Sequence, residues 1–178
     1  VDESDGLAEI NAWPALIIMT SFIWLAVAGL LGVAMPIIQR FDLGAGLFYQ
    51  ALTAHGAALA FPFTFQLMVG ISLHRAAGCL GKPVTGALPA LIYISMNLGA
   101  ALLTVAILMG FSISYIVMYP LPLVGVENGQ WSYEALVLGF TGLGLVLFAM
   151  IIFYPVQVLK TSFFGTKREE LILSERTI

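Results

Sequence analysis

The sequence predicts an all-α membrane protein with four transmembrane helices, and three observations lead to this fold class. Of the 178 residues, 60% are apolar and only 10% are Asp, Glu, Lys or Arg, whereas roughly a quarter of a soluble domain is charged. The charged residues lie at the edges of four long uncharged runs. These runs show no alternation of polar and apolar residues, and a helix satisfies its own backbone polar groups in lipid.

The same composition excludes several classes of protein. A short chain this apolar cannot bury its apolar surface as a soluble enzyme. Its net charge of −3 does not suit a nucleic-acid binder. Its single cysteine, Cys79, excludes a disulfide framework and a cysteine-based metal cluster. We therefore expect lipid to surround most of the chain.

Each uncharged run is long enough for one crossing, which takes about 20 residues. The expected helices are 12–38, 46–73, 84–118 and 132–159. The third run could hold two helices, but Tyr119-Pro120-Leu121-Pro122 breaks it, which predicts one long helix ending at Met118. Pro62 inside the second helix predicts a kink.

The distribution of Lys and Arg predicts the orientation. With both termini on the cytoplasmic side, six basic residues lie inside and only Arg40 lies outside. The predicted organisation is a cytoplasmic arm (1–11), a transmembrane domain (12–160) and a cytoplasmic tail (161–178) of a multi-pass plasma-membrane protein. The acidic arm argues against a signal peptide, which would begin with positive charge.

His55 is the only ionisable residue in the interior of the four spans. It follows the start of the second helix by about ten residues, or roughly 15 Å, which places it in the outer half of the bilayer. Two interpretations stay open: a histidine hydrogen-bonded to a neighbouring helix, or an axial ligand of haem iron. The small neighbouring residues suit either a flat macrocycle or close helix packing. The candidate cofactor-binding residues are His55, Gly56, Ala51 and Leu59, with His55 as the metal ligand and no catalytic residue.

Two segments resemble subunit I of the haem–copper terminal oxidases. The first is 49–56, with the core Thr53-Ala54-His55-Gly56 at the outer start of the second helix. The second is 115–123, similar to the family's aromatic-x-x-Tyr-Pro-Pro-Leu loop, although Leu121 separates Pro120 from Pro122 here. The resemblance covers only the first four transmembrane helices of the family and looks closer to its B-type branch. It implies that His55 binds a low-spin haem and that the four helices pack as part of a larger helical bundle.

The resemblance also implies what this chain lacks. The family's second ligand to that haem, its high-spin haem histidine and its copper ligands lie on later helices and have no counterpart here. The leading hypothesis is therefore the N-terminal part of a split subunit I in a respiratory complex, which shares a haem with a larger membrane subunit, binds no copper and is not an enzyme alone. Electrons would come from a copper- or cytochrome-bearing subunit on the outer face and pass to oxygen. The alternatives are an accessory structural subunit without a cofactor and a homodimeric cytochrome b with a shared haem.

Other polar or small residues in the spans carry weaker signals. Ala28 and Gly32 form a small-xxx-small pair that suits helix packing. The scattered polar side chains of the spans are expected to form mainly interhelical hydrogen bonds or caps. They are Gln66, Asn97, Thr104, Ser112 and Ser114.

Overall fold

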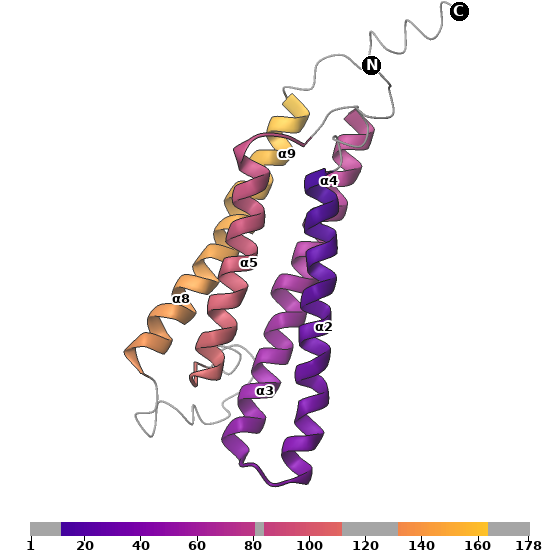
Figure 1. Cartoon of the computed structure of the whole chain (residues 1–178). Coiled ribbons are helices and arrows are strands. Elements are labelled where there is room, and N and C mark those ends of the chain that lie inside the picture. The colour runs from indigo at the N-terminus through magenta and orange to yellow at the C-terminus, as the bar shows by residue number, and fades with distance from the viewer. Residues whose placement is uncertain (1–11, 81–83, 112–131, 164–178) are drawn as a thin grey trace, which may run out of the picture.

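The computed structural model describes residues 12–80, 84–111 and 132–163, and within them every regular element is helical. The elements are α2 (Ala12–Arg40), α3 (Ala45–Ala58), the π-helix η1 (Leu59–Phe65), α4 (Gln66–Leu80), α5 (Ala87–Leu108), α8 (Tyr133–Phe148), the π-helix η2 (Ala149–Phe153) and α9 (Tyr154–Phe163) (Figure 1). α3, η1 and α4 are continuous, and so are α8, η2 and α9. These residues therefore form four long helices, each apolar enough to cross a membrane, which confirms the predicted all-α class and its four candidate spans.

The four helices form two antiparallel hairpins. In the first, α2 packs along α3, η1 and α4, and in the second, α5 packs along α8 and η2. Contacts of α3 with α5 and of α4 with α9 join the hairpins. The start of α2 and the end of α9 lie at the same end of the structure (Figure 1).

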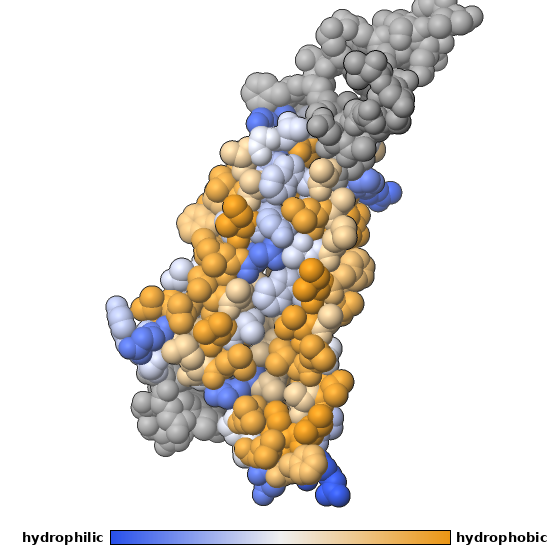
Figure 2. Space-filling model, in the orientation of Figure 1, coloured by the Kyte–Doolittle hydropathy of each residue, from blue (hydrophilic) through white to orange (hydrophobic). Residues whose placement is uncertain are grey.

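Most of the apolar surface points outward. In the most apolar stretch of α2 only 17% of the residues are buried, and long side chains such as Met19, Ile23, Leu30 and Val33 are exposed. Apolar residues cover most of the face shown in Figure 2. Because exposing so much apolar surface to water is unfavourable, lipid or further membrane helices must cover it.

The third helix ends ten residues before the predicted end at Met118. Gly110 adopts a left-handed conformation, with φ of 99°. Its N–H donates to the Ile107 carbonyl at 2.9 Å, and the Phe111 N–H donates to the Ala106 carbonyl at 2.9 Å. These two bonds form a Schellman motif, which ends a helix and satisfies its last carbonyls. The prediction relied on the prolines at 120 and 122, which lie outside the described residues, and overlooked this glycine.

The interruption expected at Pro62 takes the form of a π-helix. Proline has no N–H and its ring clashes with the carbonyl four residues earlier, so an α-helix cannot continue unchanged through it. In η1 the wider turn surrounds Pro62 and keeps the helix continuous. η2 ends just before Pro155, so the fourth helix also has a π-helix next to a proline. π-turns occur often at functional sites, and η1 begins one turn after His55.

The second hairpin depends on two glycines that face each other. A Cβ on Gly99 would lie 2.7 Å from the Gly142 carbonyl oxygen, and a Cβ on Gly142 would lie 2.6 Å from the Gly99 carbonyl oxygen. Real side chains do not approach backbone so closely, so only glycine allows α5 and α8 to pack at this distance.

We predict that Gly142→Ala forces α5 and α8 apart and lowers the free energy of unfolding by about 1–3 kcal/mol, as overpacking does. The control is Gly144→Ala on the same helix, because a Cβ there meets nothing within 4 Å. Circular dichroism during unfolding in mixed detergent micelles measures both variants. An equal effect of the two substitutions would contradict the close approach.

Candidate functional site

His55 lies where the first two helices face each other. Its Nδ1 is 2.8 Å from the backbone carbonyl oxygen of Ala28 on α2. A Cβ built on Gly32, one turn further along α2, would lie only 3.1 Å from Cε1 and 3.2 Å from Nδ1 of the same ring. The small pair Ala28 and Gly32, expected to serve helix packing, therefore makes the space that the imidazole occupies.

This hydrogen bond assigns the tautomer of His55. A carbonyl oxygen only accepts, so Nδ1 carries the proton and donates it to Ala28. In a neutral ring Nε2 then keeps its lone pair, and it has no hydrogen bond to any other described residue. The side chain is half-buried. Metal-binding histidines use the same arrangement, in which one ring nitrogen donates to a carbonyl and the other binds the metal.

The surface beside His55 is open on one side of the contact between α2 and α3. Gly29 directly follows Ala28 on α2, and Gly56 directly follows His55 on α3; Ala28 and His55 face each other. Because the helices are antiparallel with about 3.6 residues per turn, both glycines turn to the same side of the contact. Both are exposed, and a Cβ on either would meet nothing within 4 Å. A flat group can approach the backbone on this side.

The opposite side of the contact is closed. Ala54 is fully buried in a cluster with Leu103, Ala106, Ile107, Phe111 and Ala135. Ala51 and Ala58 share its helix face and are also buried. Of the predicted cofactor-binding residues, the structure places Gly56 and the half-buried Leu59 near the open side with His55. It places Ala51 in the helix packing.

A second polar side chain of this helix also bonds to a main-chain carbonyl of α2. The fully buried Gln66 donates from Nε2 to the Ile17 carbonyl oxygen at 3.2 Å. Gln66 follows His55 by eleven residues, and Ile17 precedes Ala28 by eleven. The two bonds join the same pair of helices at two levels, so together they fix one antiparallel register of the hairpin. The Oε1 atom of Gln66 is buried without a hydrogen-bond partner.

A further interhelical bond joins the two hairpins beside the site. Trp24, one turn before Ala28, donates from Nε1 to Oδ1 of Asn97 on α5 at 2.9 Å. Polar and weakly apolar residues form a band along the middle of the face shown in Figure 2. The predicted interhelical bonding is thus confirmed for Gln66 and Asn97, whereas Thr104 bonds to Ala100 of its own helix. Ser112 and Ser114 lie outside the described residues.

Within 12–80, 84–111 and 132–163, no three His, Cys, Asp or Glu residues lie close enough together to hold a metal ion. The chain has two histidines. His74 is exposed and lies nineteen residues after His55 on the same helix. This part of the chain therefore offers one imidazole to a group bound between the helices.

Sequence reasoning missed the partners of His55 on the first helix. Ala28, Gly29 and Gly32 are recognisable in the sequence as small residues. Which of them faces His55 depends on the register between two helices, and no local pattern gives that register.

Comparisons of this chain with protein-family models, with curated proteins and with solved structures gave no match. Of the two resembling segments, 49–56 lies in α3, and 115–123 lies outside the described residues.

We predict opposite effects for alanine at two neighbouring glycines. Gly32→Ala presses on the His55 ring and lowers the unfolding free energy by about 1–2 kcal/mol. Gly29→Ala meets open space and raises that energy by up to about 1 kcal/mol through helix propensity.

The double variant Gly32→Ala/His55→Ala tests the cause of the Gly32 effect. Once the ring is gone, the added methyl group has space, so its cost should largely disappear in a double-mutant cycle. Unfolding in mixed micelles gives all the required energies. Additive effects would show that the Gly32 contact with His55 is not responsible.

Proposed function

We propose that this chain is the N-terminal part of a split subunit I in a membrane complex of the haem–copper oxidase type. In this proposal it supplies His55 as one axial ligand of a low-spin haem that it shares with a larger membrane subunit. Both termini lie on the cytoplasmic side of the plasma membrane, and a copper- or cytochrome-bearing subunit delivers electrons at the outer face. The chain binds no copper and does not reduce oxygen alone.

The observation that carries this proposal is the hydrogen bond from His55 Nδ1 to the Ala28 carbonyl oxygen. It fixes the orientation of the ring and leaves the Nε2 lone pair for a metal. Imidazole is a common axial ligand of haem iron. The likeness of residues 49–56 to the haem-binding segment of the family supports the same role.

The residues around His55 suit a flat apolar macrocycle. Gly29 and Gly56 leave space on one side of the contact between α2 and α3. Leu52, one turn before His55, is exposed, and Leu59, one turn after it, is half-buried, so apolar side chains flank this space. When bound, a haem supplies one-electron transfer. The chain's own residues provide the ligand (His55), orient it (Ala28) and form one wall (Gly56 and Leu59).

The number of histidines explains why a partner is needed. A low-spin haem takes a second strong ligand, and His74 is exposed and nineteen residues away. In this proposal the second ligand comes from the larger membrane subunit. The largely exposed apolar helix faces provide a surface on which a larger membrane subunit could pack.

An accessory structural subunit without a cofactor is the second candidate. It is favoured by the same bond between His55 and Ala28, because that bond already gives the ring a partner within the protein. The burial of Ala51 and Ala58 also shows small residues used for helix packing. The two candidates differ in whether Nε2 binds iron.

We predict that His55→Ala in the purified native complex removes the low-spin haem signal from the reduced-minus-oxidised absorption spectrum. The cause is the loss of the axial Nε2 ligand. The matched control, His74→Ala, changes the other histidine of the same helix, which is exposed at its far end, and should leave the spectrum intact.

An unchanged haem signal in His55→Ala, with the complex still assembled, would refute the proposal and favour the structural candidate. The isolated chain should bind no haem by itself. A haem absorption band from the isolated chain would instead indicate a homodimeric cytochrome b.

A further inference from the structure

Gln66 is buried inside the first hairpin, although its side chain is a primary amide. Its exposed fraction is 0%, and its side chain makes one hydrogen bond to the described residues, from Nε2 to the Ile17 carbonyl oxygen. The Oε1 atom is buried and accepts no hydrogen bond. An unpaired buried acceptor is unfavourable, and a leucine at this position would avoid it. The chain therefore keeps a costly group where α4 meets α2.

The contact around Gln66 is built like the one around His55. Gly70 follows Gln66 by one turn, and a Cβ there would lie 2.6 Å from Cγ1 and 3.2 Å from the backbone nitrogen of Ile18. Gly32 is equally close to the His55 ring. At both levels a polar side chain bonds to a carbonyl of α2, and a glycine one turn away allows the close approach.

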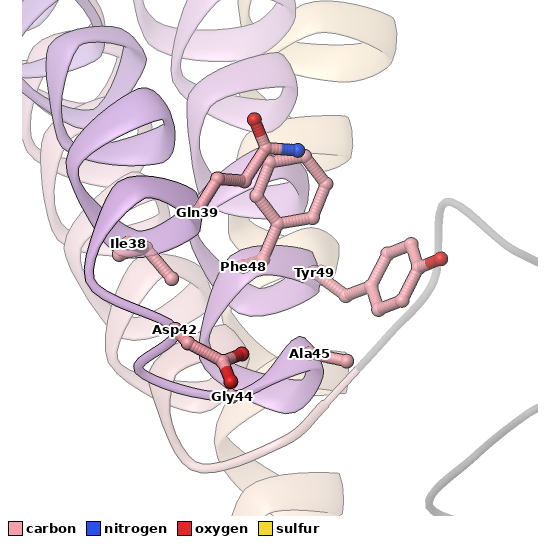
Figure 3. Close-up of a pocket in the computed structure, with 7 residues that line it drawn as sticks. All are labelled: Ile38, Gln39, Asp42, Gly44, Ala45, Phe48 and Tyr49. Carbon is pink, nitrogen blue, oxygen red and sulfur yellow. The ribbon is translucent and has the colours of Figure 1, made fainter.

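Other features of the first hairpin select its alignment only weakly. In lipid, apolar side chains gain little by facing a helix instead of acyl chains, so apolar packing distinguishes poorly between alignments. At the connection, the last turn of α2 and the first turn of α3 line an open hollow of about 430 Å³ beside Asp42, Ala45 and Phe48 (Figure 3). The connection therefore leaves the rotation of α3 to contacts deeper in the hairpin.

The bond at Gln66 acts on the same long helix that carries His55. α3, η1 and α4 follow one another without a break, so a movement at Gln66 is transmitted towards His55. A single bond at His55 would leave this helix free to pivot about that point. The second bond, eleven residues further along both helices, prevents the pivoting.

We propose that Gln66 is a positioning residue for His55. Its bond to Ile17 holds the second helix in the alignment in which the imidazole meets the Ala28 carbonyl oxygen and Nε2 stays free. The consequence for a haem rests on the proposed function, whereas the alignment itself needs no cofactor.

Gln157 provides a matched comparison within the same chain. It is 2% exposed, and its Oε1 atom also accepts no hydrogen bond. Its Nε2 donates to Thr161 one turn later on its own helix. Gln66 and Gln157 therefore share size, burial and an unpaired oxygen, but only the Gln66 amide joins two helices. Leucine at each position separates positioning from the mere removal of a buried amide.

The first experiment measures the alignment of the helices by pulsed electron paramagnetic resonance. The full chain, with the exposed Cys79 replaced by Ser, carries two spin labels in lipid nanodiscs. One labelled pair lies near the level of His55 and the other near the level of Gln66. The pairs are Leu30 with Leu52 and Met19 with Met68, and all four positions are exposed.

Gln66→Leu should add a second distance to both labelled pairs. Loss of one interhelical bond should lower the ratio of aligned to misaligned hairpins by about tenfold. Gln157→Leu should leave both distance distributions as in the wild type. Gln66→Glu should restore the single distance at mildly acidic pH, because a neutral carboxyl group keeps a donor for the Ile17 carbonyl.

The second experiment examines the site at His55 in the purified native complex. Gln66→Leu should lower the low-spin haem signal in the absorption spectrum, and Gln157→Leu should not. A wild-type complex without this signal would refute the proposed function, and the distance measurement would still decide whether Gln66 positions His55.

Four outcomes would overturn the positioning role. The first is an unchanged distance in both pairs of Gln66→Leu. The second is a change confined to the pair near Gln66, which would show that the bond positions α4 and not His55. The third is an equal change in Gln157→Leu. The fourth is loss of helix content in Gln66→Leu by circular dichroism, which would show that the bond is needed for folding itself.

Discussion

The hydrogen bond between the His55 imidazole and the Ala28 carbonyl determines most of what is distinctive in this structure. A polar ring within a lipid-spanning helix must be satisfied, and a backbone carbonyl with a second lone pair is the partner that α2 offers. The bond places α2 and α3 in one register, brings the ring close to Gly32 and assigns the proton to Nδ1. The free Nε2 atom is a consequence of this bond. A structural contact and a ligand site are therefore two results of one interaction.

Glycines serve two opposite purposes in the two hairpins. Gly99 and Gly142 allow close helix packing, because each lies against the backbone of the opposite helix. Gly29 and Gly56 are left open, with no atom near the position of a side chain. Composition alone cannot separate these roles, since all four lie in apolar helices. Their different surroundings explain why the first hairpin has, next to His55, a surface beside which a bound group could lie.

The sequence predicted the number and approximate positions of the spans because hydropathy and length act over whole helices. The first described helix spans Ala12–Arg40, close to the expected 12–38, and the histidine of the interior was identified. The end of the third helix was wrong, because a Schellman motif at Gly110 depends on one residue, whereas the prolines gave a stronger pattern further on. The partners of His55 were missed for a different reason. They depend on the register between two helices, which the bonds at His55 and Gln66 fix together and which no segment encodes alone.

The level of His55 along the bundle follows from its neighbour Ala54. That residue belongs to a buried cluster with Leu103, Ala106 and Ile107 of α5, with Phe111 just after α5 and with Ala135 in the first turn of α8. The imidazole therefore lies near the level at which α5 ends and α8 begins. The apolar shell around a metal centre controls its dielectric surroundings and its reduction potential. The reduction potential of a redox group bound at this level would depend largely on what else covers it.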